Sequence, residues 1–222
     1  MSLCVIPARG GSKRIPGKNI KEFSGKPMIA WSIEAAIQSG IFKNIIVSTD
    51  DEEIARIAKD NGAMVPFVRP NELSDDFANT ADVMMHACNW SKEQSINSDY
   101  VCCIYATAPF VSADDIIAAF NILKDRNWKY VFSAAVNPLP VYRSFTQSTE
   151  GGVEMIFPEH YKTRSQDLPK VQYDAAQFYF GTFEAWVNKE IMFENHSYPF
   201  IIDHDRVQDI DTIEDWKLAC LL

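Results

Sequence analysis

A regular alternation of short apolar runs with segments of helical periodicity constrains this chain more than any other feature. Runs of strand length are each followed by a stretch whose apolar residues recur three or four positions apart, as on one face of a helix. Strands that alternate with helices predict an α/β fold, a three-layer sandwich whose mostly parallel sheet is covered on both faces. We expect strands at 3–7, 44–48, 64–68, 100–105 and 130–136, and helices at 27–39, 51–60, 80–90 and 113–124.

The alternation stops between residues 137 and 173, where prolines and glycines separate short apolar pieces. We interpret this insertion as a β-rich excursion, suited to a substrate lid or a dimer contact. The core is expected to resume with a strand at 176–180, a short helix near 183–188, a strand near 200–202 and a last helix after Asp211. At 222 residues, the chain is expected to form one domain that carries this excursion.

The charge distribution indicates a small anionic ligand. The net charge of −9 argues against nonspecific binding to nucleic acid or to an anionic membrane, because both need a basic surface. Residues 1–26 nevertheless hold six basic residues and a single acid. A short cationic segment in an acidic protein suggests that an anion is held at one place.

The N-terminus and the cysteines favour a cytoplasmic protein. The apolar run at 3–6 is too short for a secretion signal, and no apolar run approaches the length of a membrane span. The five cysteines form an odd set without CxxC spacing. We therefore expect reduced, mostly buried thiols rather than a zinc site.

A glycine-rich basic loop follows the first expected strand, with the sequence ARGGSKRIPGKN (8–19). Its glycines let backbone N–H groups approach a polyanion, and Arg9, Lys13 and Lys18 supply positive charge for a triphosphate. The loop is neither a Walker loop nor a GxGxxG motif. We favour a phosphate site, and an ordinary solvated basic loop is the alternative.

Two aspartates near the C-terminus have the spacing of a metal site. In an extended segment, Asp209 and Asp211 face the same way while Ile210 faces the core. Two carboxylates suit Mg²⁺, which takes its remaining ligands from water and substrate phosphates. The alternative is that Asp211 or Thr212 merely caps the last helix.

Further polar residues lie where a ligand is expected. Arg69 ends an expected strand on the side where open α/β sheets bind ligands, although a surface arginine has the same pattern. Other polar residues, in or beside the excursion, suit a carboxylate and a polyhydroxylated sugar, although each alone also fits a solvated loop. They are Arg143, Arg164, Gln166, Asp174 and Gln177.

Four segments, in this order, resemble the CMP-sialic acid synthetase family: PARGGSKRIPGKNI (7–20), GKPMIA (25–30), VSTD (47–50) and QDIDT (208–212). The resemblance extends over nearly the whole chain, and ordered agreement is more specific than any one motif. It implies a nucleotide-diphospho-sugar-transferase-like fold and a homodimer joined through the excursion. It also implies transfer of CMP from CTP to a nonulosonic acid, with release of pyrophosphate.

Within that family the chain is most similar to the pseudaminic acid cytidylyltransferases. The shared segments are CIYATAPF (103–110), PEH (158–160), TRSQDL (163–168) and DAAQFY (174–179). Sialic acid enzymes typically have Gln-Pro-Thr-Ser-Pro where this chain has YATAP, which weakens the case for ordinary sialic acid. Phe180 departs from the tryptophan expected in the pseudaminic group. Pseudaminic acid is therefore the expected acceptor, with N-acetylneuraminic and legionaminic acid as alternatives.

The resemblance also implies residue roles. Nucleotide contacts are implied at Ala8, Arg9, Gly10, Ser12, Lys18, Asn19, Arg69 and Thr80. Sugar contacts are implied at Tyr105, Arg164, Gln166, Asp174, Gln177 and Tyr179. Asp209 and Asp211 would bind Mg²⁺, and Arg9, Lys18 and Asp211 would be catalytic.

Two other functions fit the same scaffold. A glycosyltransferase that consumes a nucleotide sugar also uses paired aspartates, but it has less need of a lysine on a departing pyrophosphate. A noncatalytic nucleotide-binding regulator would bind CTP without turnover. Release of pyrophosphate from CTP separates the expected reaction from both.

Overall fold

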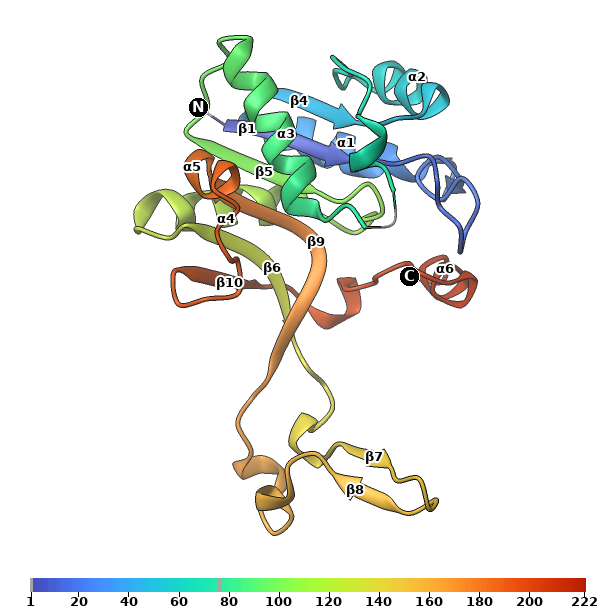
Figure 1. Ribbon diagram of the computed structural model, residues 1–222, viewed down its shortest axis with the longest axis vertical. Helices are drawn as coiled ribbons and strands as arrows, with labels where there is room; N and C mark the ends of the chain where they lie inside the picture. Colours follow the sequence, from blue (N-terminus) through green and yellow to red (C-terminus); the bar gives the residue numbers. More distant parts are fainter. Residues whose placement is uncertain (1, 76) are drawn as a thin grey trace.

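The computed structural model describes residues 2–75 and 77–222 and has a six-stranded sheet at its centre (Figure 1). The strand order is β10-β6-β9-β5-β1-β4. These strands are β1 (Ser2–Pro7), β4 (Phe42–Ser48), β5 (Tyr100–Ile104), β6 (Tyr130–Val136), β9 (Gln172–Thr182) and β10 (Ser197–Ile201). β1 is parallel to β4 and β5, and β10 is parallel to β6, whereas β9 is antiparallel to both of its neighbours. The prediction of a mostly parallel sheet is confirmed.

Helices cover both faces of this sheet. They are α1 (Met28–Ser39), α2 (Glu52–Asp60), α3 (Thr80–Glu93), α4 (Ala113–Asp125) and α5 (Phe183–Val187), whereas α6 (Ile213–Ala219) packs in a separate apolar cluster. α1, α2 and α4 bury apolar side chains against one face, and α3 and α5 do so against the other, as Figure 1 shows for α3. The three-layer sandwich is therefore confirmed. None of the helices in the described part of the chain is both long and apolar enough to cross a membrane.

The two-residue period of the strands decides which helical layer each side chain contacts. Along β1, Cys4 and Ile6 pack against the layer of α1, whereas Leu3 and Val5 pack against the layer of α3. The same alternation places the adjacent cysteines of β5 on opposite faces. All five cysteines are free thiols, and four of them are buried, in agreement with the sequence.

Residues 64–68 form no regular strand, so that prediction is wrong. Two isolated parallel bridges replace it, Ile46 with Met64 and Thr49 with Val68. Pro66 lies between the bridges and has no N–H to donate to a ladder. A short antiparallel hairpin before α1, β2 (Glu22–Phe23) with β3 (Lys26–Pro27), was not expected.

β9 is longer than expected, and its register against β6 is irregular around Ser133. The Ser133 hydroxyl accepts hydrogen bonds from the backbone N–H groups of Gln177 and Phe178, both at 3.1 Å. Next to them, Ala176 has a φ of 50°, in the left-handed region that residues other than glycine seldom adopt. Such irregularities re-aim side chains, and this one lies in the middle of the expected sugar-binding segment.

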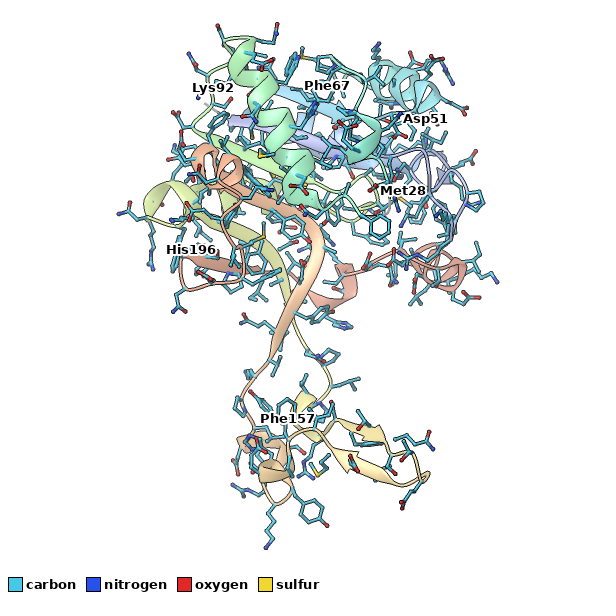
Figure 2. All side chains as sticks on the ribbon, viewed as in Figure 1. Met28, Asp51, Phe67, Lys92, Phe157 and His196 are labelled. Atoms are coloured by element: carbon cyan, nitrogen blue, oxygen red, sulfur yellow. The ribbon has the colours of Figure 1, made fainter. Side chains whose placement is uncertain are left out.

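Between β6 and β9 the chain leaves the sheet and forms a protruding arm, residues 137–171 (Figure 1). The arm holds the antiparallel hairpin β7 (Phe145–Gln147) and β8 (Val153–Met155). It also holds three single turns of helix, at Val141–Arg143, Pro158–His160 and Ser165–Asp167. Figure 2 shows Phe157 of the arm far from Met28 at the start of α1. The side chains of the arm thus lie well away from the central sheet and its helices.

Candidate active site

A polar cavity of about 390 Å³ opens at the carboxyl ends of β1 and β5. This is the edge at which open α/β sheets bind ligands. The loop after β1, the start of α3 and the residues after β5 form its walls. Most of the expected nucleotide residues line it: Arg9, Ser12, Lys18, Asn19, Arg69 and Thr80. Ala8 and Gly10 belong to the same loop.

The glycine-rich loop is held in place by hydrogen bonds to its backbone. The Gly10 N–H donates to Asp50 Oδ1 at 3.0 Å, and Asn19 Nδ2 donates to the Arg9 carbonyl at 2.9 Å. A methyl group on Gly10 would lie only 2.7 Å from Asp51 Oδ2, so this close approach requires glycine. These contacts fix the backbone of the loop against the loop after β4.

Arg69 is buried, with only 3% of its side chain exposed, so it is not an ordinary surface arginine. Nε donates to Ser74 Oγ at 3.2 Å, and Nη2 lies 3.6 Å from Asp50 Oδ1. Burial lowers the pKa of Arg69, and the charge of Asp50 opposes that shift. Nη2 has no hydrogen-bond partner among the described residues. Asp50 is the charge partner of Nη2, so Asp50 and Ser74 together hold the buried guanidinium at the cavity wall.

The loop after β1 meets the C-terminal segment beside this cavity, where Figure 1 shows α6 next to that loop. Lys18 Nζ donates to the Ile210 carbonyl at 2.6 Å and lies 3.3 Å from Asp211 Oδ1. Arg14 Nη2 lies 2.9 Å from the same Asp211 oxygen. A small apolar cluster joins the two segments: Ile15, Phe23, Met28, Ile210, Trp216 and Ala219.

Thr212, rather than Asp211, caps α6. The Thr212 hydroxyl accepts a hydrogen bond from the Asp215 N–H at 3.2 Å, and the Asp215 carboxylate accepts one from the Thr212 N–H at 2.7 Å. The alternative that Thr212 caps the last helix is therefore confirmed. The Asp211 side chain instead faces Lys18 and Arg14.

Asp209 and Asp211 form a donor set that suits a divalent cation. Partial loss of hydration, followed by the charge of Asp211, raises the pKa of Asp209, and Lys18 opposes that shift. A cation shared by the two carboxylates would relieve their repulsion. In residues 2–75 and 77–222, no three His, Cys, Asp or Glu side chains meet as a complete metal site. Further ligands would have to be water and substrate phosphates, which is the mode that Mg²⁺ prefers.

A second cavity of about 440 Å³ adjoins the first on the side of α3 and α5. Thr80 and Tyr105 line both cavities, and their hydroxyls are hydrogen-bonded at 2.9 Å. On the wall of the second cavity, Tyr179 donates its hydroxyl to Asp174 Oδ2 at 2.7 Å. Burial is the main cause that raises the pKa of Tyr105 to about 12, and it also raises the pKa of Tyr179. Both phenols therefore stay protonated at neutral pH.

Some residues on the second cavity were missed by the sequence analysis. Lys189, Met192 and Phe193 line it from the irregular segment between α5 and β10. This segment has no motif and no periodicity that would mark it. Its place beside Tyr179 follows from the order of the strands, which local sequence does not reveal.

Three of the expected sugar residues lie outside both cavities. Gln177 is 2% exposed, and its Nε2 donates to the carbonyl of Arg206. Arg164 and Gln166 lie on the arm, where Arg164 Nε pairs with Asp167 Oδ2 at 2.7 Å. The chain therefore does not bring these three side chains to the tyrosines of the second cavity.

Known proteins are similar in sequence to this chain over all or nearly all of its length. The profile of the cytidylyltransferase family matches residues 3–213. The pseudaminic acid cytidylyltransferase of Campylobacter jejuni subsp. jejuni serotype O:2 is 45% identical over 221 residues, which cover 100% of this chain and 95% of that protein. The CMP-N,N'-diacetyllegionaminic acid synthase of Legionella pneumophila subsp. pneumophila is 30% identical over 98% of this chain and 94% of that protein.

A solved structure shares the fold. CMP-2-keto-3-deoxy-manno-octonic acid synthetase in complex with CTP has a TM-score of 0.73 and 16% identity, and the likeness covers 99% of this chain and 97% of that one. Cytidylyltransferases of this kind generally use a divalent metal, which agrees with the paired aspartates. The family match and the identity to full-length relatives lead to one conclusion: this chain belongs to the cytidylyltransferase family and is a nucleotidyltransferase.

Proposed function

We propose that this enzyme transfers CMP from CTP to the anomeric hydroxyl of a nonulosonic acid, with pseudaminic acid as the preferred acceptor. One observation carries the proposal: Lys18 and Asp211, from opposite ends of the chain, lie 3.3 Å apart beside the polar cavity. Nucleotidyl transfer needs cationic groups on the phosphates and carboxylates for a metal at one place. The likeness to the pseudaminic acid cytidylyltransferase supports the acceptor.

The first cavity is the proposed CTP site. Arg69 and Thr80 line this pocket, and the cytidine lies against them. The basic side chains of the first loop face the triphosphate. The loop residues that hold it are Ala8, Arg9, Gly10, Ser12, Lys18 and Asn19.

In the proposed reaction, the anomeric oxygen bonds to the α-phosphorus while the bond from that phosphorus to pyrophosphate breaks, and the hydroxyl proton passes to solvent. Arg9 and Lys18 offset the negative charge that gathers on the phosphates and on the leaving group. Asp209 and Asp211 hold Mg²⁺, which when bound supplies a Lewis acid to the phosphates. Catalysis then rests mainly on positioning and charge neutralisation.

The second cavity is the proposed sugar site. Tyr105, Asp174 and Tyr179 offer hydrogen-bonding groups to the sugar hydroxyls. Met192 and Phe193 offer apolar surface to its acyl groups. Because Tyr105 lines both cavities, a sugar held here lies next to the nucleotide.

A panel of acceptors tests this function. The purified protein is incubated with CTP, Mg²⁺ and either pseudaminic, legionaminic, N-acetylneuraminic or 3-deoxy-octulosonic acid, and pyrophosphate is measured. Pseudaminic acid is expected to give the highest kcat/KM, by about tenfold or more, because small differences between ligands are worth about 1–3 kcal/mol in such a pocket. A clear preference for another acid contradicts the acceptor assignment. CTP binding without pyrophosphate release from any acid would indicate a noncatalytic regulator.

We further propose a homodimer in which the arm of one subunit reaches the sugar site of the other. Apolar side chains on the arm are exposed in a single subunit: Leu139, Phe145, Val153, Ile156 and Tyr161. Clustered exposed apolar surface is typical of an interaction site. Docking on a partner would also bring Arg164 and Gln166 to a sugar that they do not reach in their own subunit.

Mixing two inactive variants tests this arrangement. Arg164→Ala removes a sugar contact that the arm supplies to the partner. Asp211→Asn removes a metal ligand from the rest of the subunit, which here is called the body. Each variant homodimer is therefore expected to lose most of its activity. In a co-expressed mixed dimer, one of the two sites combines an intact arm with an intact body. Statistical mixing is then expected to restore up to about a quarter of the wild-type activity. A monomer by light scattering, or no recovery in isolated mixed dimers, contradicts the proposal.

We also propose that residues 1–222 act as one cytidylyltransferase domain in the cytoplasm. Five free thiols fit a reducing compartment. Cell fractionation tests this location, and recovery of the protein outside the cytoplasmic fraction contradicts it.

A further inference from the structure

The stretch between Ile202 and Ile210 connects the sheet to the paired aspartates. At one end, the Ile202 N–H donates to the Ala134 carbonyl at 2.9 Å. At the other end, Ile210 is fully buried in the apolar cluster beside the first loop. A single turn of helix at His204–Arg206 lies between these two anchors. Because Mg²⁺ demands near-ideal geometry, the position of this stretch matters for the carboxylates of Asp209 and Asp211.

The side chain of Arg206 fastens this stretch to the start of α4. Its Nη1 is hydrogen-bonded to Asp115 Oδ2, and its Nη2 lies 3.4 Å from Asp115 Oδ1. The Asp115 side chain is 15% exposed and also accepts a hydrogen bond from the Ser112 hydroxyl at 2.7 Å. A bidentate ion pair that is partly buried is stronger and more directional than an exposed ion pair.

The backbone of Arg206 is tied to the sheet by Gln177, whose Nε2 donates to the Arg206 carbonyl at 2.5 Å. Gln177 is itself fixed in place. Its N–H donates to Ser133 Oγ at 3.1 Å, and its carbonyl accepts a hydrogen bond from the Tyr105 N–H at 2.9 Å. Arg206 is therefore held from two directions, through its side chain and through its backbone, three residues before Asp209.

We propose that Asp115, Gln177 and Arg206 are positioning residues for the divalent-metal site. They hold the loop so that both aspartates present their carboxylates to the same cation. This inference rests on the proposed metal role of Asp209 and Asp211. Residues that support metal ligands in this way typically change metal affinity or activity by about 10–100-fold when they are removed.

Binding of Mn²⁺, measured by electron paramagnetic resonance in the presence of CTP, tests the inference without relying on turnover. Arg206→Met is expected to weaken Mn²⁺ binding by about tenfold or more. It should also raise the Mg²⁺ concentration for half-maximal activity, while kcat at saturating Mg²⁺ falls much less. The matched control is Arg56→Met, which breaks the exposed pair of Arg56 with Asp60 and should leave Mn²⁺ binding unchanged.

Two further variants separate positioning from stability. Arg206→Lys keeps the positive charge, so the variant is expected to stay folded. It lacks the planar guanidinium that makes the bidentate contact, so it is still expected to weaken Mn²⁺ binding. Asp115→Asn combined with Arg206→Met should be no worse than either single variant, because both remove the same contact. If Arg206→Lys binds Mn²⁺ like the wild type and only its Tm falls, the role of Arg206 is merely structural and the inference is overturned. The Arg206→Lys result decides the question even if Arg206→Met fails to fold.

Asp211→Asn distinguishes a failure of this inference from a failure of the proposed function. If Asp211→Asn loses Mn²⁺ binding while the Arg206 variants bind normally, the inference alone is wrong. If Asp211→Asn binds Mn²⁺ as tightly as the wild type, the metal role of the aspartates is wrong.

Discussion

Lys18→Ala is expected to lower kcat for CMP-sugar formation by at least about two orders of magnitude while the protein stays folded. Lys18 Nζ contacts the Ile210 carbonyl and Asp211, and only 17% of its side chain is exposed. Negative charge develops on the phosphates and on the departing pyrophosphate in the transition state, and a cation already in place stabilises it without reorganisation. Losing one such partner typically costs about 2.7–4 kcal/mol of transition-state stabilisation.

Lys21→Ala is the matched control for Lys18→Ala. Lys21 lies three residues further along, outside the residues that line the cavity, with Nζ 5.4 Å from the centre of the Trp216 ring. Both substitutions remove one positive charge from the same segment, so a general weakening of the local field would affect both. A continuous pyrophosphate assay measures kcat, and circular dichroism checks the fold. Near-normal kcat in folded Lys18→Ala would contradict the catalytic assignment.

Local periodicity was enough to predict the central sheet. The interior strands are buried on both faces, so they appear in the sequence as continuous apolar runs, as in LCVI of β1. Residues 64–68 have a similar composition, but Pro66 interrupts the ladder. Apolar composition does not fix the burial of such a segment, because Met64 and Val68 are exposed. Nor does it show how far the pairing extends.

The site likewise combines motifs that the local sequence reveals with contacts between residues that are far apart in the chain. The first loop and the aspartate pair have local signatures, whereas their meeting does not, because Lys18 and Ile210 are 192 positions apart. Their contact depends on how α6 packs against the first loop. Gln177 shows a second limit. Gln177 was expected to bind the sugar, but its side-chain amide donates to the Arg206 carbonyl. The sequence cannot distinguish these two roles, because both use the same residue type in the same segment.

Asp211→Asn is expected to lower kcat by at least about two orders of magnitude without weakening CTP binding. Asp211 Oδ1 lies 2.9 Å from Arg14 Nη2 and 3.3 Å from Lys18 Nζ, so this carboxylate is shared by two cations. The carboxamide keeps the size of the side chain but removes the charge that both cations face. Arg14 and Lys18 then face the phosphates of CTP without a competing carboxylate. The KM for CTP is therefore expected to stay level or fall while kcat collapses.

Glu214→Gln is the matched control for Asp211→Asn, because it removes one negative charge from the first turn of α6 at an exposed position. It is expected to leave both constants within about twofold of the wild type, as is usual for surface substitutions. Steady-state kinetics over a range of CTP and Mg²⁺ concentrations separates the possibilities. If Asp211→Asn raises the KM for CTP and keeps kcat, the carboxylate helps to bind the nucleotide instead of holding the metal. In that case the ion pairs of Asp211 with Arg14 and Lys18 only hold the first loop against the C-terminal segment. Other groups of the cavity must then stabilise the transition state.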